Sequence, residues 1–136
     1  MNDHYLRFKT IQGSFPMPKS RFNDGRNGED KAAAFLEAAG MHIIARNVRS
    51  PDGEIDIIAQ DEEVIVFVEV KAWSAYGVEN LQYSINKQKQ YRIIETAKYF
   101  LDANRNYNTM TVRFDVVFIG PQSITHLKSA FVEGLE

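Results

Sequence analysis

The chain has 136 residues, no cysteine and a formal net charge of −2. Its length fits a single domain with its own core, and the lack of cysteine excludes disulfides and thiolate metal sites. No apolar run is long enough to span a membrane, and the N-terminus lacks the apolar segment of a signal peptide. We therefore expect a cytoplasmic protein with no membrane partner.

The charges are distributed unevenly along the chain. Residues 1–26 carry five lysines and arginines against two acids, residues 27–82 four against eleven, and residues 83–113 six against two. A metal-dependent nuclease needs acids for cations at its centre and bases for phosphates around them. Ordinary solvation of surface helices explains the same distribution equally well.

The N-terminal third predicts an arm, a helix and a strand. Residues 1–24 contain prolines, glycine and aromatics without a period, which predicts an irregular arm before one domain over residues 25–136. Residues 26–39 predict a helix with an apolar stripe, and residues 41–48 predict a strand. By residue type alone, Glu29 is an acid in the first turns that complements the helix dipole.

Two arginines follow in this strand and in the turn after it. Residues 50–53 predict the turn. Arg46 and Arg49 could contact phosphate or pair with the surrounding acids, and the two roles carry equal weight.

Residues 53–73 predict a hairpin of two apolar, β-branched strands joined by an acidic turn. We place Asp61 and Glu62 at the centre of the turn, so that Ala59 pairs with Val64. Both faces of this hairpin are apolar enough to be covered by other elements.

The same register brings charged residues together near the far end of the hairpin. It pairs Asp56 with Phe67, which puts Asp56 diagonal to Glu69, within about 7–8 Å, and Glu54 directly opposite Glu69. Glu69 and Lys71 share a face because side chains alternate along a strand.

Buried acids in a sheet need compensation, because an unpaired buried carboxylate is strongly unfavourable. A divalent cation is the simplest explanation, and carboxylate oxygens suit Mg²⁺ or Mn²⁺. An ion pair of Lys71 with Glu69 or Asp56, or an exposed strand end, explains the same residues about as well.

The C-terminal half predicts a loop, a helix and a final strand. Residues 74–83 form the loop, and the aromatics Trp73, Tyr76 and Tyr83 could stack on bases, close a dimer contact or pack in the core. A helix runs from residue 84 or 85 to 103. A strand follows over residues 111–119, with a salt bridge between Arg113 and Asp115, and residues 124–131 could add a short strand.

Several of these motifs resemble known proteins. Asp56 followed by Glu69-Val70-Lys71 on the next strand resembles the D…(D/E)xK core of the PD-(D/E)xK nuclease superfamily. The combination over residues 27–119 resembles more closely the YraN-like family of uncharacterised bacterial proteins, which is similar to archaeal Holliday-junction resolvases. The motifs are Gly28-Glu29 before a helix, Arg46-Asn47, Arg49, Gly53-Glu54-Ile55-Asp56, Val66-Phe67-Val68-Glu69-Val70-Lys71 and Lys89-Gln90.

Two features depart from the family. Ala72-Trp73 stands where the family shows a small polar residue and arginine, and the segment before Gly25 is longer than the family's.

The resemblance implies an α/β protein with a restriction-endonuclease-like three-layer fold, in which helices flank a mixed central sheet in an αβββαβ order. It implies a metal-dependent endonuclease that cuts DNA, with branched DNA as one candidate substrate. Mg²⁺ or Mn²⁺ would be held by Asp56, Glu69, the carbonyl of Val70 and Glu29, with Lys71 as a further catalytic residue. The expected nucleic-acid contacts are Arg46, Arg49, Lys87, Lys89, Gln90 and Arg92.

Other functions remain open at this point. A resolvase-like role would imply a homodimer. The acidic pI of 5.9 favours a nucleic-acid-binding or interaction module without catalysis, because fold alone does not fix function. An adaptor that uses the aromatic N-terminal arm is a third candidate.

Overall fold

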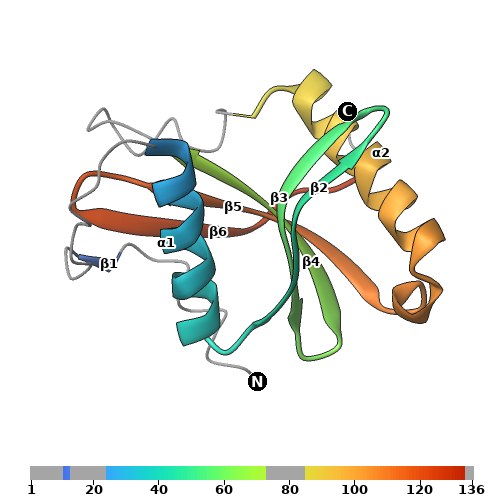
Figure 1. Cartoon of the computed structure of the whole chain (residues 1–136), viewed down its shortest axis with the longest axis horizontal. Helices are drawn as coiled ribbons and strands as arrows, with labels where there is room; N and C mark the ends of the chain where they lie inside the picture. The colour runs from blue at the N-terminus through green and yellow to red at the C-terminus, as the bar shows by residue number, and fades with distance from the viewer. Residues whose placement is uncertain (1–10, 13–23, 73–84, 134–136) are drawn as a thin grey trace.

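The computed structural model describes residues 11–12, 24–72 and 85–133 (Figure 1). The secondary structure elements are β1 (Ile11–Gln12), α1 (Asp24–Ala38), β2 (His42–Ser50), β3 (Gly53–Asp61), β4 (Val64–Ala72), α2 (Lys87–Ala103), the 3₁₀ helix η3 (Arg105–Tyr107), β5 (Thr111–Ile119) and β6 (Ser123–Phe131). Within these residues, no helix is both long and apolar enough to cross a membrane.

The strands form one mixed sheet in the order β1-β6-β5-β4-β3-β2. The β4–β5 pair is parallel and the other neighbours are antiparallel. A parallel pair needs a crossover connection, and α2 lies in the segment that links β4 to β5. The predicted αβββαβ order of the restriction-endonuclease-like fold is therefore confirmed, with β6 added beyond β5.

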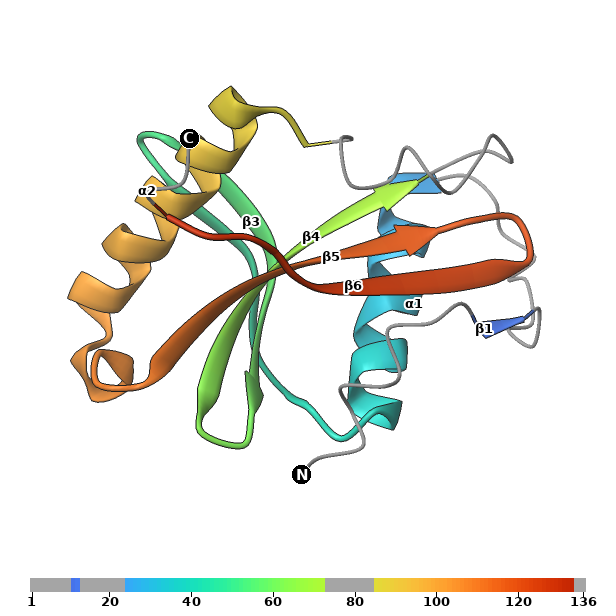
Figure 2. The same ribbon diagram turned by 180° about the vertical axis from the view of Figure 1, so that it is seen from behind.

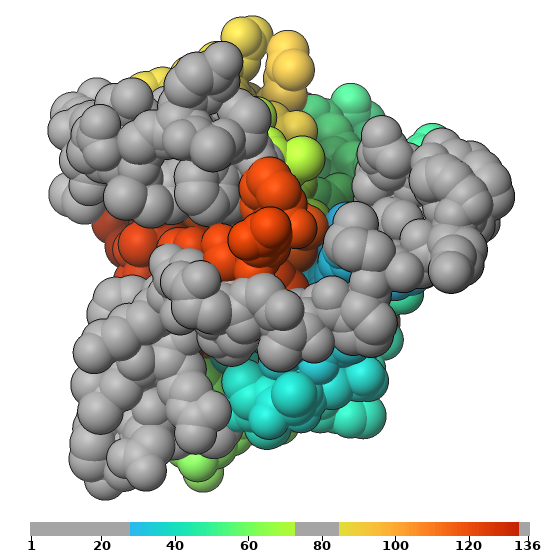
Figure 3. Space-filling model, turned by 90° about the vertical axis from the view of Figure 1, so that its left-hand side faces the viewer, coloured from blue at the N-terminus to red at the C-terminus, as the bar shows by residue number. Residues whose placement is uncertain are grey.

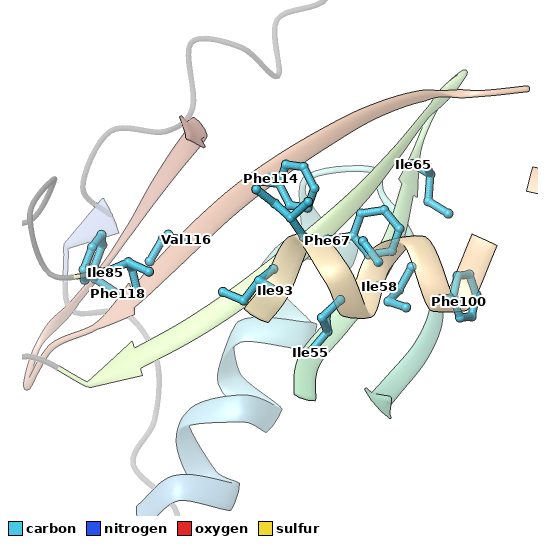
Figure 4. Close-up of a cluster of buried hydrophobic side chains, with 12 residues drawn as sticks. Ile55, Ile58, Ile65, Phe67, Ile85, Ile93, Phe100, Phe114, Val116 and Phe118 are labelled. Carbon is cyan, nitrogen blue, oxygen red and sulfur yellow. The ribbon is translucent and has the colours of Figure 1, made fainter. Parts of the chain in front are cut away.

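The two helices cover opposite faces of the sheet, which makes three layers. In Figure 1, α1 lies in front of the sheet, and in the reversed view of Figure 2 it lies behind it. The α2 face packs Ile93 and Phe100 against Phe67 and Phe114, as Figure 4 shows. The α1 face packs Leu36 and other α1 residues against alternate positions of the same strands, namely Ile57, Ala59, Val66, Val68 and Val117.

The central position of β4 in the sheet explains why its sequence is an unbroken apolar run. Ile65 and Phe67 belong to the core under α2, and Val66 and Val68 belong to the core under α1. All four side chains are fully buried. A central strand covered on both faces loses the usual apolar–polar alternation, so the prediction that both faces are covered is confirmed.

The predicted hairpin register is wrong by two residues. Asp61 pairs with Val64 and Ile58 pairs with Phe67, so the turn is Glu62-Glu63. Asp61 belongs to the strand because it is 2% exposed and pairs with Arg113 of β5, with its Oδ2 3.1 Å from Nη1. A shift of two residues keeps every side chain on its predicted face.

The predicted salt bridge between Arg113 and Asp115 is confirmed, at 2.9 Å between Nε and Oδ1. It is part of a buried polar cluster, because Asp115 also accepts a 2.8 Å hydrogen bond from His126 and one from the Ser129 amide. His126 is 1% exposed. The predicted strand near the C-terminus is also confirmed, as β6.

Some predictions fall outside the described residues. They include the loop over residues 74–83 and the three aromatics Trp73, Tyr76 and Tyr83. They also include most of the predicted N-terminal arm, of which the structure describes Ile11 and Gln12, paired with Ile124 and Ser123 of β6.

Candidate metal centre

The β3–β4 ladder ends where the acids lie. Its backbone pairs run from Asp61↔Val64 to Ile57↔Val68. One step further, the amide of Val70 donates a 2.8 Å hydrogen bond to Oδ2 of Asp56. Continuing the register past the last pair puts Asp56 directly beside Glu69.

This geometry corrects two predicted relationships. Asp56 faces Glu69 across the strands instead of lying diagonal to it. Glu54 does not oppose Glu69; it pairs with Arg49 of β2 in the ladder, and the two side chains form a loose ion pair at 3.8 Å. The predicted pairing failed because the turn lies two residues further along the chain, at Glu62-Glu63.

Both acids are held in an environment that disfavours their charge. Glu69 is 9% exposed, and burial together with the neighbouring Asp56 raises its pKa to about 7, against the opposing charges of Lys89 and Lys71. Burial also raises the pKa of Asp56, opposed by the Val70 amide and reinforced by the charges of Glu29 and Glu54. Two neighbouring acids with raised pKa values, Glu69 buried and Asp56 half-buried, are a functional-site signature.

Helix α2 places a lysine beside this pair of acids. Nζ of Lys89 lies 3.4 Å from Oε2 of Glu69. The helix begins after Asn86, whose Oδ1 accepts a hydrogen bond from the amide of Lys89, and Gln90 donates to the carbonyl of Ile85. This cap places the helix start at Lys87, two to three residues later than predicted.

Contacts at the turn between β2 and β3 anchor α2 over the sheet. Oγ of Ser50 and Oγ1 of the fully buried Thr96 are 2.8 Å apart. A Cβ at Gly53 would lie 3.2 Å from Cβ of Arg92, so turn and helix approach closely. This packing fixes the orientation of α2 that directs Lys89 toward Glu69.

Helix α1 contributes Glu29, which is tied to two consecutive residues of β2. Its Oε1 accepts hydrogen bonds from Nη2 of Arg46 at 3.1 Å and from Nδ2 of Asn47 at 3.0 Å. Arg46 also contacts Asp30 at 2.7 Å. Of the two roles open for Arg46 and Arg49, the structure therefore displays pairing with acids, and phosphate contact stays a prediction.

The remaining predicted residues lie around the pair. Lys71 follows Glu69 by two positions on β4, on the same face, and is half-buried. Lys87 and Arg92 are exposed on α2. Gly28 of α1 lies near Ile119 at the end of β5, so the start of α1 and the ends of β4 and β5 meet at one side of the molecule. Figure 3, viewed from that side, shows green atoms of β4 and blue atoms of α1 beside orange atoms of β6.

The residues fit a divalent cation held by two carboxylates. Over residues 24–72 and 85–133, no three His, Cys, Asp or Glu side chains lie close enough to share one ion. Asp56, which is half-buried, and Glu69, which is buried, are nonetheless adjacent carboxylates, and the carbonyl of Val70 follows Glu69 directly in the chain. Mg²⁺ keeps several waters and needs only one or two protein carboxylates.

Asn47 belongs to the Arg46-Asn47 motif, but the sequence predicted no role for it in the site. Asparagine is disfavoured inside strands, and its presence between Arg46 and Val48 was the available signal. Its φ of 55° is left-handed, which the sequence pattern does not reveal.

The fold and the paired acids define an α/β protein of restriction-endonuclease-like architecture. A family model described as "Uncharacterised protein family UPF0102" matches residues 28–119. The chain belongs to this family, which is the YraN-like family that its motifs resemble.

Three relatives illustrate the match, and each is named UPF0102 protein. One from Treponema pallidum (strain Nichols) is 45% identical over 122 residues, covering 85% of this chain and 97% of the relative. One from Rhodopseudomonas palustris (strain HaA2) is 40% identical over 124 residues, covering 90% and 95%. One from Persephonella marina is 43% identical over 107 residues, covering 79% and 91%.

Proposed function

We propose that this protein is a metal-dependent nuclease that hydrolyses phosphodiester bonds in DNA, with branched DNA as the first substrate to test. The observation that carries the proposal is the pair of neighbouring carboxylates, the half-buried Asp56 and the buried Glu69, at the point where the β3–β4 ladder ends. Lys71 lies on the same face as Glu69, two positions along β4. As a DNA nuclease, the protein would act in the cytoplasm.

The proposed cation is Mg²⁺ or Mn²⁺, held by Asp56, Glu69 and the carbonyl of Val70, with Glu29 as an auxiliary ligand. The ion, when bound, supplies Lewis acidity and lowers the pKa of its water. Burial supports this role, because two desolvated carboxylates side by side repel one another and are stabilised by a cation between them.

The chain's own residues would perform the other steps. The Val70 amide fixes the carboxylate of Asp56 by its 2.8 Å hydrogen bond. Lys71 would orient or deprotonate the attacking water and stabilise the charge that develops on the phosphate. Its half-buried position beside two acids keeps it within the site instead of in bulk solvent.

The proposed DNA contacts lie around this centre. Lys87, Lys89 and Arg92 are on the first turns of α2, and Arg49 is exposed on β2. Cations in such positions bind phosphates and orient the strand without reading its sequence. Arg46 and Gln90 would contribute only if they exchange their present partners for DNA. A homodimer would let two such centres cut two strands symmetrically.

Cleavage of labelled DNA tests the proposal. Duplex, single-stranded, flap and four-way-junction substrates are incubated with Mg²⁺ or Mn²⁺ and the wild-type protein, Asp56→Asn or Lys71→Ala. We expect metal-dependent cutting that both substitutions reduce at least a hundredfold. Lys98→Ala is the matched control, because Lys98 is exposed and pairs with Glu95 and Glu133. Cutting that survives in Asp56→Asn would contradict the proposal.

A second candidate is a nucleic-acid-binding module without catalysis. The observation that favours it is that the acids already have protein cations, with Lys89 at 3.4 Å from Glu69 and Arg46 at 3.1 Å from Glu29. Such a module would bind DNA equally well in the presence of EDTA and would bind no Mn²⁺ that Asp56→Asn removes. The adaptor role of the N-terminal arm would be tested by deleting residues 1–22 and measuring the oligomeric state.

A further inference from the structure

Asn47 lies in line with the two central acids. In the β2–β3 ladder, Arg46 pairs with Ile57 and Val48 pairs with Ile55, so Asn47 lies beside Asp56. Asp56 in turn lies beside Glu69 of β4. Three neighbouring strands thus place Asn47, Asp56 and Glu69 at adjacent backbone positions across the sheet.

The backbone at Asn47 departs from a regular strand. Its φ of 55° lies in the left-handed region, which is uncommon for residues other than glycine. In a regular strand, consecutive side chains point to opposite faces. Here Arg46 and Asn47 both donate to Oε1 of Glu29, and both Ala45 and Val48 pack against the core under α2. The left-handed residue therefore reverses the alternation so that two adjacent side chains reach one carboxylate.

The position of α1 brings that carboxylate toward the centre. A Cβ at Gly28 would lie 3.8 Å from Cγ1 of Ile119. Ile119 pairs with Ala72, the residue after Lys71. Glu29 therefore lies near the ends of the central strands, and its 3.0 Å bond to Asn47 ties its carboxylate to the β2 position beside Asp56.

We propose that Asn47, together with Arg46, is a positioning residue that fixes the carboxylate of Glu29 near the Asp56–Glu69 pair, within reach of the waters that a divalent cation held by the two acids would keep. This inference rests on the proposed function. Glycine would adopt the left-handed backbone without strain. Asparagine tolerates this region better than most other residues, and at this position it also supplies the amide that binds Glu29.

The variant Asn47→Gly separates the contribution of the amide side chain from that of the left-handed backbone. Glycine keeps the left-handed backbone and removes the amide donor. We expect the melting temperature to stay equal or rise, and the dissociation constant for Mn²⁺ of the full chain to increase tenfold to a hundredfold, as for other groups that orient a metal ligand. Calorimetric titration with MnCl₂ measures the affinity, and thermal unfolding in EDTA measures the stability.

A matched control is available in the same chain. Glu62 has a φ of 57° in the β3–β4 turn, at the opposite end of the ladder from Asp56 and Glu69. Glu62→Gly makes the same change to a left-handed position, and we expect the Mn²⁺ affinity to be unchanged. A second test combines Asn47→Gly with Glu29→Gln. If Asn47 acts through Glu29, Asn47→Gly has no further effect on affinity in the Glu29→Gln protein.

The outcomes are distinguishable. If the wild-type protein binds no Mn²⁺, the proposed function fails and this inference fails with it. If the wild type binds and Asn47→Gly binds equally well, only the positioning role is overturned. A loss of affinity together with a lowered melting temperature would mark Asn47 as merely structural. If Asn47→Gly weakens Mn²⁺ binding as much in the Glu29→Gln protein as in the wild type, Asn47 does not act through Glu29. Each of these two results would overturn the inference.

Discussion

Nζ of Lys89 lies 3.4 Å from Oε2 of Glu69, so the first turn of α2 supplies a cation to a buried acid on the central strand β4. Lysine at this position lowers the pKa of Glu69, against burial and the charge of Asp56, which raise it to about 7. The relationship makes the ionisation of Glu69 depend on a residue twenty positions further along the chain.

Lys89→Met is therefore expected to raise the pKa of Glu69 above its value of about 7. The methionine keeps most of the apolar stem of the side chain and removes only the charge. A carboxyl ¹³C NMR titration of Glu69 in EDTA measures the change, with Lys98→Met as the control on the same helix. A pKa of Glu69 that is the same in Lys89→Met and wild type would show that the pair does not persist in solution.

Glu69→Gln is expected to stabilise the metal-free protein at alkaline pH. The pKa of Glu69 is about 7 in the folded state against 4.5 for the ordinary group. Between these values the folded state holds a proton that the unfolded state has released, so stability falls as pH rises. Above pH 7 the full penalty is present, about 3 kcal/mol for such a shift, and glutamine avoids it.

Urea unfolding in EDTA at pH 8 and pH 4 measures this difference. We expect Glu69→Gln to be more stable than wild type by about 2–3 kcal/mol at pH 8, with most of the gain absent at pH 4. Glu37→Gln, at an exposed position of α1, should differ from wild type by less than about 0.5 kcal/mol at both pH values. An equal effect of Glu69→Gln at both pH values would rule out the pKa shift as its cause.

Asp115→Asn is expected to be strongly destabilising. Asp115 is fully buried, and although burial opposes its charge, hydrogen bonds from His126 and Arg113 hold its pKa below the ordinary value. Removing the carboxylate leaves the buried Arg113 without its closest counter-charge. Breaking a buried ion pair from one side costs about 3–5 kcal/mol.

Urea unfolding at pH 7 measures the effect of Asp115→Asn, with the exposed Asp52→Asn as the control. The side chain of Asp115 contacts Arg113 and His126 and neither central acid, so a folded fraction of the variant should still bind Mn²⁺ with wild-type affinity. A loss of stability below about 1 kcal/mol, the size of one ordinary hydrogen bond, would contradict this account of the cluster.

The hydrophobic pattern predicted most of the fold because each strand and helix of the core follows a local rule. The unbroken run in β4 indicated a strand covered on both faces, and the stripe in α1 indicated which side it packs. The boundaries of β5 agree with prediction, since Thr111–Ile119 is bounded by turn residues.

The predictions that were wrong or missing concern features that depend on contacts between residues far apart in the sequence. Asp61 was assigned to a turn because acids favour turns, and its burial against Arg113, 52 residues away, could not be read locally. The turn itself has a left-handed Glu62 where a glycine would have marked it. The left-handed Asn47 and its bond to Glu29 were hidden for the same reason, since they join β2 to a different element.

Binding of Mn²⁺ to the full-length wild-type protein and to Asp56→Asn, measured by calorimetric titration at pH 8, tests the central claim most directly. At this pH Glu69 is mostly ionised, because its pKa is about 7. We predict binding by the wild type and a loss of at least tenfold in affinity in Asp56→Asn, with Asp52→Asn unchanged. Equal binding by Asp56→Asn and the wild type, or no binding by either, would contradict a metal centre at Asp56 and Glu69.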